Sequence, residues 1–149
     1  MARPLAEGEA APPFALRDAE GRLHRLEDYR GQWLLLCFYP RDFTPGCTRE
    51  LCVFRDELEG LPPLLAVSLD PPQRHRAFAA RHRLPFPLLC DDGGVASRYG
   101  VLRRFGPWRW TRRASFLVDP TGVVRRAYLR PRPSCHGGAV ARDFAALSR

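Results

Sequence analysis

Lysine is absent from this sequence of 149 residues: all 24 basic residues are arginine, and with 16 acidic residues they give a formal net charge of +8. The arginines are spread along the whole chain, and pairs such as Arg103-Arg104 and Arg125-Arg126 fall short of the basic run that marks a nucleic-acid-binding segment. Uniform use of arginine in place of lysine is typical of codon bias in a GC-rich genome. We therefore expect a solvated basic surface and no specific nucleic-acid partner.

Long apolar runs are also missing. The longest uncharged apolar stretch, residues 32–40, is far shorter than the roughly 20 residues that a bilayer-spanning helix needs, so we expect no membrane partner. The first residues, MARPLAEGEAAPPF, include two glutamates and no apolar core of the kind that secretory signals carry, which predicts a cytoplasmic protein. A hydrophobic content of 45% over this length favours a single globular domain, residues 1–149.

Cysteine spacings of the zinc-binding type do not occur. The sequence has no C-x-x-C pair and its histidines are scattered, so we expect no metal site. Without a secretory signal the cysteines are not expected to form a disulfide scaffold, which leaves reactive or buried thiols. An odd number of them fits one working pair with bystanders. The cysteines are Cys37, Cys47, Cys52, Cys90 and Cys135.

The apolar pattern predicts an α/β fold. Residues 33–39 form a short continuous apolar run between Gly31 and Pro40, which is typical of a strand buried on both faces. A helix is expected over residues 44–59, because Pro45 suits the start of a helix and Gly60 suits its end.

The remaining elements follow the same reasoning. We expect strands at 64–69 and 86–90, helices at 72–84, 92–99 and 137–148, and β-hairpins at 14–26 and at 115–118 with 123–129. The second hairpin turns at DPTG, with Pro and Gly where a β-turn favours them. This order predicts a mixed central β-sheet flanked by helices on both sides, the thioredoxin-like arrangement, with an N-terminal β-hairpin extension.

Cys47 is the candidate nucleophile. Residues 38–52 (FYPRDFTPGCTRELC) run from the end of the buried strand through a Pro/Gly turn into the helix, and they place Cys47 in its first turn. A thiol there faces unpaired backbone N–H groups and the positive end of the helix dipole, which favours its thiolate.

The same segment resembles a known family. PRDFTPGC matches the P-x-x-x-T-x-x-C signature of peroxiredoxins, and FYPRDFTPGCTRELCVFRD resembles the bacterioferritin comigratory protein (BCP or PrxQ) subfamily, as do FPLLCDDGG and RASFLVDPTG. The resemblance implies a thiol-dependent peroxidase that reduces hydrogen peroxide and organic hydroperoxides. It implies oxidation of Cys47 to sulfenic acid, a disulfide with Cys52, and reduction by thioredoxin or a glutaredoxin-like dithiol donor. It implies no haem, flavin or metal, and a monomer.

The resemblance also assigns roles to neighbouring residues. Pro40, which has no N–H, would shield the pocket from water, and Thr44 would aim its hydroxyl at the bound peroxide. Arg113 would reach the thiolate and the peroxide with its fork of donors, although Arg112 is a competing choice. Glu50 would orient that arginine; its alternative is an ordinary carboxylate on a helix surface.

A disulfide between Cys47 and Cys52 is incompatible with an intact helix. Five helical residues at about 100° each place its side chain roughly 140° from that of Cys47, with the Cα atoms about 8 Å apart, beyond the roughly 7 Å limit for a disulfide. If Cys52 resolves the sulfenic acid, the first turns of the helix must unwind; otherwise Cys52 is a buried helix thiol. Cys37 is expected in the core, and Cys90 and Cys135 are bystanders or secondary redox partners.

The sequence departs from the family pattern at two places. Ser115 occupies a position where relatives usually have Thr. Residues 105–111 (FGPWRWT) place Trp108 and Trp110 shortly before Arg113. These side chains could shape the pocket for bulkier hydroperoxides, form an interaction surface, or cover the core as a loop.

Two other functions are alternatives to a peroxidase. A thiol-disulfide oxidoreductase is disfavoured because C-x-x-C is missing. A basic binding or chaperone-like module with a thioredoxin fold would leave the joint presence of the site residues unexplained.

Overall fold

The computed structural model describes residues 3–149. Its strands are β1 (Ala15–Asp18), β2 (Leu23–Arg25), β3 (Leu34–Phe38), β4 (Leu64–Ser68), β5 (Leu88–Cys90), β6 (Leu102–Phe105), β7 (Trp108–Thr111), β8 (Ala114–Val118) and β9 (Val124–Tyr128). Its α-helices are α1 (Pro45–Asp56), α2 (Pro72–His82), α3 (Gly94–Arg98) and α4 (His136–Leu147), with short 3-10 helices at Leu26–Tyr29 and Leu58–Gly60.

Within these residues a seven-stranded sheet has the order β2-β1-β5-β4-β3-β8-β9. β4 pairs in parallel with β3 and β5, whereas the other neighbours are antiparallel, so the prediction of a mixed sheet is confirmed. The predicted N-terminal hairpin forms as β1 and β2. Because β1 also pairs with β5, this hairpin is an edge of the central sheet.

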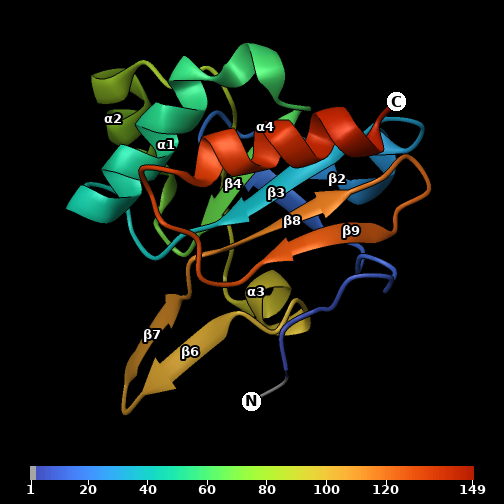
Figure 1. Ribbon diagram of the computed structural model, residues 1–149. Helices are drawn as coiled ribbons and strands as arrows, with labels where there is room; N and C mark the ends of the chain where they lie inside the picture. The colour runs from blue at the N-terminus through green and yellow to red at the C-terminus, as the bar shows by residue number, and fades with distance from the viewer. Residues whose placement is uncertain (1–2) are drawn as a thin grey trace.

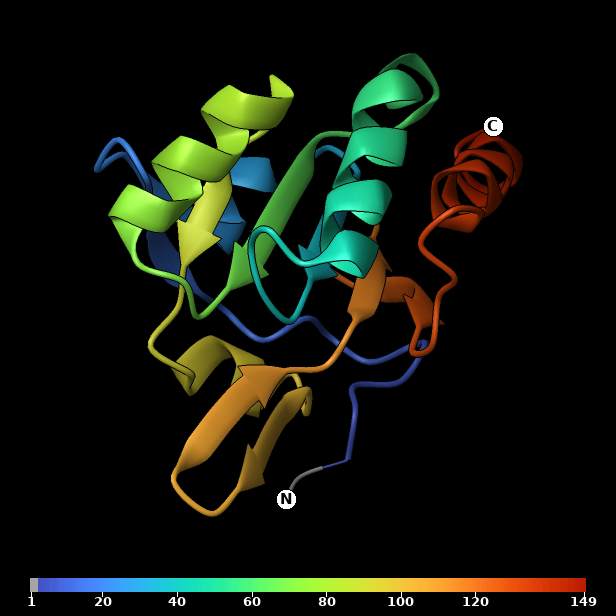
Figure 2. The same cartoon turned by 90° about the vertical axis from the view of Figure 1, so that its left-hand side faces the viewer.

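Helices cover both faces of the sheet (Figures 1 and 2): α1, α2 and α4 lie on one face and α3 on the other. Strand β3 shows why. Leu34, Leu36 and Phe38 belong to the core cluster that includes residues of α3, while Leu35 and Cys37 belong to the cluster beneath the other three helices. A strand whose alternate side chains both face apolar layers is continuously hydrophobic, as the sequence indicated.

Two details differ from the sequence-based prediction. The helix expected to reach Glu59 ends at Asp56, and the chain continues as the 3-10 helix Leu58–Gly60, because the last turn tightens as helix ends often do. Residues 102–111, to which no strands were assigned, form the antiparallel hairpin β6–β7. Its turn contains Gly106 at a φ of 59°, a conformation that glycine adopts readily.

None of the helices formed by residues 3–149 has the length and the apolar character needed to cross a bilayer.

Candidate active site

Cys47 lies where the central strand β3 meets the helix α1. Thr44 is the N-cap of α1, and the first intrahelical bond of the turn runs from the Thr48 N–H to the Thr44 carbonyl oxygen at 2.9 Å. The N–H groups of Gly46 and Cys47 precede that bond, so they have no carbonyl partner inside the helix. Cys47 itself is fully buried. Its thiol therefore lies in the electropositive first turn, as predicted.

Arg113 reaches this thiol from the neighbouring strand. β8 pairs with β3 so that Ala114 lies opposite Phe38, which brings the preceding residue, Arg113, to the end of β3 where the turn to α1 begins. The Arg113 Nη2 lies 3.4 Å from the Cys47 Sγ. Arg112, the competing choice, points elsewhere and donates to the Leu129 carbonyl oxygen at 2.5 Å.

Gly46 leaves room for this arginine. A Cβ atom built on Gly46 would lie 2.9 Å from the Arg113 Nη2, closer than side chains normally approach. The guanidinium thus occupies the space that any other residue at position 46 would fill.

Glu50 holds the other side of the guanidinium. Its Oε1 accepts a hydrogen bond from the Arg113 Nη1 at 2.9 Å and lies 3.8 Å from the Cys37 Sγ. The carboxyl is fully buried, and its Oε2 has no hydrogen-bond partner among residues 3–149. Burial raises the pKa of Glu50 to about 7, and the charge of Arg113 opposes that rise. Burial also raises the pKa of the Cys37 thiol, which therefore stays protonated beside this carboxyl.

The two remaining residues of the predicted pocket flank the turn. The Thr44 hydroxyl donates to the Arg41 carbonyl oxygen at 2.9 Å, and its lone pairs can still accept. Thr44 and Pro40 are both half-buried, so they lie between the core and the surface.

Cys52 lies in the same continuous helix as Cys47 and is half-buried. Both are free thiols. Since α1 is helical from Pro45 to Asp56, the Cα atoms of the two cysteines are separated by about 8 Å. Cys90 is half-buried, and burial raises its pKa to about 11; Cys135 is exposed at the start of α4.

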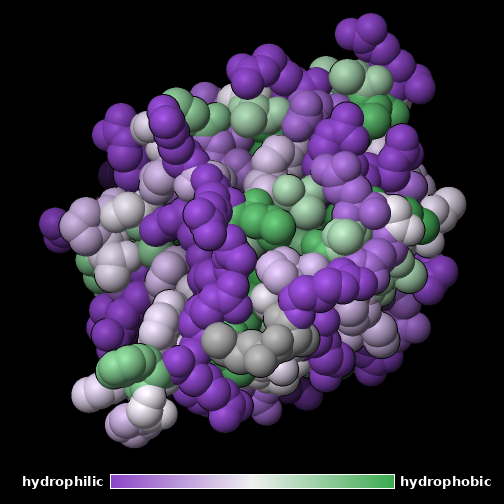
Figure 3. Space-filling view, turned by 60° about the horizontal axis from the view of Figure 1, so that its bottom comes forward, coloured by the Kyte–Doolittle hydropathy of each residue, from purple (hydrophilic) through white to green (hydrophobic). Residues whose placement is uncertain are grey.

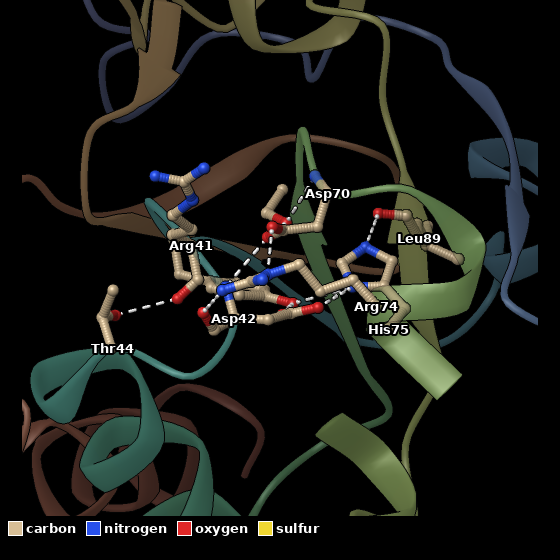
Figure 4. A network of polar contacts seen from close by, with 9 residues as sticks. Arg41, Asp42, Thr44, Asp70, Arg74, His75 and Leu89 are labelled. Atoms are coloured by element: carbon tan, nitrogen blue, oxygen red, sulfur yellow. Dashed lines mark hydrogen bonds and ion pairs between the residues drawn. The ribbon is translucent and has the colours of Figure 1, made fainter. Parts of the chain in front are cut away.

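A second polar cluster was missed by the sequence analysis. Asp42, Asp70 and His75 are buried, and one ligand-type atom from each lies within 4.8 Å of the others (Figure 4). His75 Nδ1 is only 2.6 Å from Asp42 Oδ2, a hydrogen-bond distance that leaves no space for a metal ion with bonds of about 2.0–2.2 Å. The cluster fits a hydrogen-bonded ion pair. The only signal in the sequence was a histidine on the helical face shared with Phe78.

The β6–β7 hairpin projects from the body next to α3 (Figures 1 and 2). Phe105 pairs with Trp108 across the hairpin, and Arg103 with Trp110, so these side chains share one face. Phe105, Trp108 and Trp110 are 72%, 67% and 39% exposed, so they do not cover the core. In Figure 3 this side of the molecule is mostly hydrophilic, with a small hydrophobic group at the lower left, where Figure 1 places the hairpin.

The fold and the site together define a class: a thioredoxin-like protein with a thiol at the N-terminus of its first long helix and an arginine against the sulfur. Similarity to known proteins supports this class. The sequence matches the AhpC/TSA family over residues 8–127, and the chain belongs to that family.

Relatives within the family are BCP and PrxQ proteins. Peroxiredoxin Bcp of Bacillus subtilis is 36% identical over 138 residues, which cover 87% of this chain and 88% of that protein. The crystal structure of the peroxidoxin BcpB from Mycobacterium tuberculosis superposes with a TM-score of 0.86 at 28% identity, covering 95% of this chain and 97% of that one.

A third relative is the Xanthomonas campestris bacterioferritin comigratory protein, in structures that address its alkyl peroxide reduction activity. It gives a TM-score of 0.84 at 28% identity over 91% of this chain and 92% of that one. The predicted thioredoxin-like fold and the resemblance to BCP and PrxQ peroxiredoxins are confirmed, and with them the prediction of a peroxidase.

Proposed function

We propose that Cys47 is the nucleophile of a two-cysteine cycle that reduces hydrogen peroxide and alkyl hydroperoxides. The observation that carries the proposal is the Arg113 guanidinium, which bridges the buried Cys47 Sγ at 3.4 Å and the Glu50 carboxyl at 2.9 Å. A fixed cation beside a thiol in the first turn of a helix stabilises negative charge on the sulfur and on the oxygen that departs when the O–O bond of a peroxide breaks.

In the first step the Cys47 thiolate attacks one peroxide oxygen. An S–O bond forms, the O–O bond breaks, and the leaving oxygen carries its electron pair away as alkoxide or hydroxide, which takes up a proton to become alcohol or water. We propose that Arg113 and the free N–H groups of the first turn stabilise that charge, while the Thr44 hydroxyl, whose proton goes to the Arg41 carbonyl oxygen, accepts from the O–H of the peroxide. Pro40 offers no competing N–H at the edge of the pocket.

In the second step the Cys52 sulfur attacks the Cys47 sulfenic acid, and water leaves as the disulfide forms. The helical separation of about 8 Å between these residues forbids that bond while α1 is intact. Unwinding of the first turns of α1 is therefore part of the cycle. An external dithiol, thioredoxin or a glutaredoxin-like protein, returns both thiols.

Alkyl hydroperoxides are included because the Xanthomonas campestris relative has been studied for alkyl peroxide reduction. The organisation of residues 1–149 as one domain, a monomer and a cytoplasmic location stay our predictions. Size-exclusion chromatography with light scattering, limited proteolysis and fractionation of the source cells test them.

The test of the cycle is peroxide-dependent NADPH oxidation coupled through thioredoxin and its reductase. We expect turnover by the wild type, none by Cys47→Ser, and none in steady state by Cys52→Ser, while Cys90→Ser serves as the matched control and keeps wild-type turnover. Full activity of Cys47→Ser would overturn the assignment of the nucleophile. Full activity of Cys52→Ser would move resolution to Cys90, to Cys135 or to an external thiol, and the Cys90→Ser control tests the first of these.

A further inference from the structure

A buried network of polar and charged side chains forms hydrogen bonds with the turn that connects β3 to α1. Asp42 lies at its centre and is fully buried. Its Oδ2 accepts from His75 Nδ1 at 2.6 Å, and its Oδ1 accepts from the Tyr39 hydroxyl at 2.5 Å. Its backbone N–H donates to Asp70 Oδ2, and its carbonyl oxygen accepts from Arg74 Nη2, both at 2.9 Å (Figure 4). Every polar group of Asp42 is engaged.

His75 ties this aspartate to two further elements. It belongs to α2, and its Nε2 lies 3.0 Å from the Leu89 carbonyl oxygen of β5. An oxygen therefore lies within hydrogen-bond distance of each ring nitrogen, which fixes the orientation of the imidazole. An ion pair with no exposed surface is stabilising only when its remaining hydrogen bonds are made, and loss of either partner leaves an unpaired buried group. The pair therefore fastens the turn to α2 and to the sheet.

The next residue shows that the turn is held under strain. Phe43 has a φ of 66°, in the left-handed region that side chains other than glycine rarely adopt unless their surroundings enforce it. Its ring packs against Phe78, with centroids 5.0 Å apart, and lies 5.3 Å from the Arg74 guanidinium carbon. Both partners belong to α2. Thr44, the N-cap of α1, follows directly.

We propose that Asp42 and His75 are positioning residues for peroxide reduction. Through the turn at residues 41–44 they hold the Thr44 hydroxyl and the first turn of α1 in the geometry that cleavage of the O–O bond requires. The inference rests on the proposed function, since it explains how the donors around Cys47 are kept in place. Neither residue touches the reacting sulfur.

Two reactions of the Cys47 thiol distinguish a positioning role of Asp42 and His75 from a purely structural role. Alkylation of Cys47 by iodoacetamide needs the thiolate and access, whereas reduction of hydrogen peroxide also needs oriented donors around the leaving oxygen. A loosened turn slows the peroxide reaction but does not slow alkylation, because it makes the buried thiol no less accessible. General destabilisation of the fold changes both reactions together.

The experiment uses the full chain with Cys52, Cys90 and Cys135 replaced by Ser, so that Cys47 and the core thiol Cys37 are the cysteines that remain. Asp42→Asn and His75→Gln are compared with a matched control outside the network, Asp56→Asn, which changes an exposed aspartate of α1. Second-order rate constants for hydrogen peroxide and for iodoacetamide are followed by mass spectrometry at Cys47, and each protein is checked by thermal melting.

We expect the peroxide rate constant to fall about 100-fold in Asp42→Asn and His75→Gln, the scale of a 1 Å misplacement, while the alkylation rate constant falls by no more than about threefold. The Asp56→Asn control should match the parent protein. Equal losses in the two reactions, or no loss in either, would overturn the proposal. If these variants fail to fold, Tyr39→Phe removes a single hydrogen bond to Asp42 and must lower the ratio of the two constants in the same direction.

The outcome is distinguishable from a failure of the proposed function. If the parent protein itself reacts with hydrogen peroxide no faster than a free thiol, the peroxidase cycle fails before any variant is compared. A reactive parent with unaffected network variants refutes the positioning role alone.

Discussion

Formation of the Cys47–Cys52 disulfide should unwind the first turns of α1. The perturbation is one equivalent of hydrogen peroxide added to the reduced protein. In the helix the Cα atoms of the two cysteines are about 8 Å apart, whereas disulfides usually need 4.4 to 6.8 Å, so the segment between them must leave the helical path. Cys47, Glu50 and Leu51 are buried in the reduced structure, and their release would expose them as well.

Hydrogen exchange measures this directly. Unwinding from Cys47 to Cys52 breaks the helical bonds of the amides in between, so a peptide over residues 44–54 should gain about five deuterons at early times in the oxidised protein. The peptide over α2 should be unchanged, and Cys52→Ser treated in the same way should show no gain. Identical exchange of residues 44–54 in the reduced and disulfide forms would refute the reasoning.

Three further predictions concern the guanidinium and its carboxyl. Gly46→Ala places a methyl 2.9 Å from the Arg113 Nη2, so it should lower the peroxide rate constant about tenfold with little change in melting temperature; an unchanged rate constant contradicts this. Arg113→Lys cannot contact Cys47 and Glu50 with two separate nitrogens, so it should lower kcat/KM for peroxide by about 10²-fold, as removal of one charge-stabilising donor does. Near-wild-type activity would contradict the requirement for a two-pronged guanidinium. Glu50 keeps its proton in the folded state up to its pKa of about 7 but loses it near 4.5 when unfolded. The free energy of unfolding of the wild type relative to Glu50→Gln should therefore fall by about 3 kcal/mol as pH rises through that window. Urea unfolding that gives the same difference between the two proteins at pH 4.5 and at pH 8 would refute the assignment.

Local features of the sequence were enough to predict the scaffold of the site. The uninterrupted apolar run of β3 records burial on both faces, and the Pro and Gly residues near 45 and 60 mark the ends of a helical segment. Because these signals depend on backbone constraints within a few residues, they placed Cys47 in a helical first turn without knowledge of the rest of the chain. The exposed β6–β7 hairpin escaped prediction because an alternation of arginine and aromatic residues, open to solvent, has no buried periodicity to reveal it.

The choice between Arg112 and Arg113 depended on the sequence and on the tertiary structure. The resemblance to the family favoured Arg113, and the register of β8 against β3 then showed which guanidinium lies at the sulfur. Burial of the Glu50 carboxyl, and the resulting rise of its pKa, follow from packing beneath α1, which no spacing in the sequence expresses.

The sequence by itself determined the fold class, the family and the place of Cys47 in the first turn of a helix, since each depends on periodicity or on residues that are close neighbours in the chain. Only the tertiary structure decided which distant side chains meet. Asp42 and His75 are 33 residues apart, and their contact exists because β3, β4 and β5 align and bring α2 beside the turn that precedes α1. A sequence shows what each residue can donate or accept, whereas a long-range pairing is set by sheet order and helix packing.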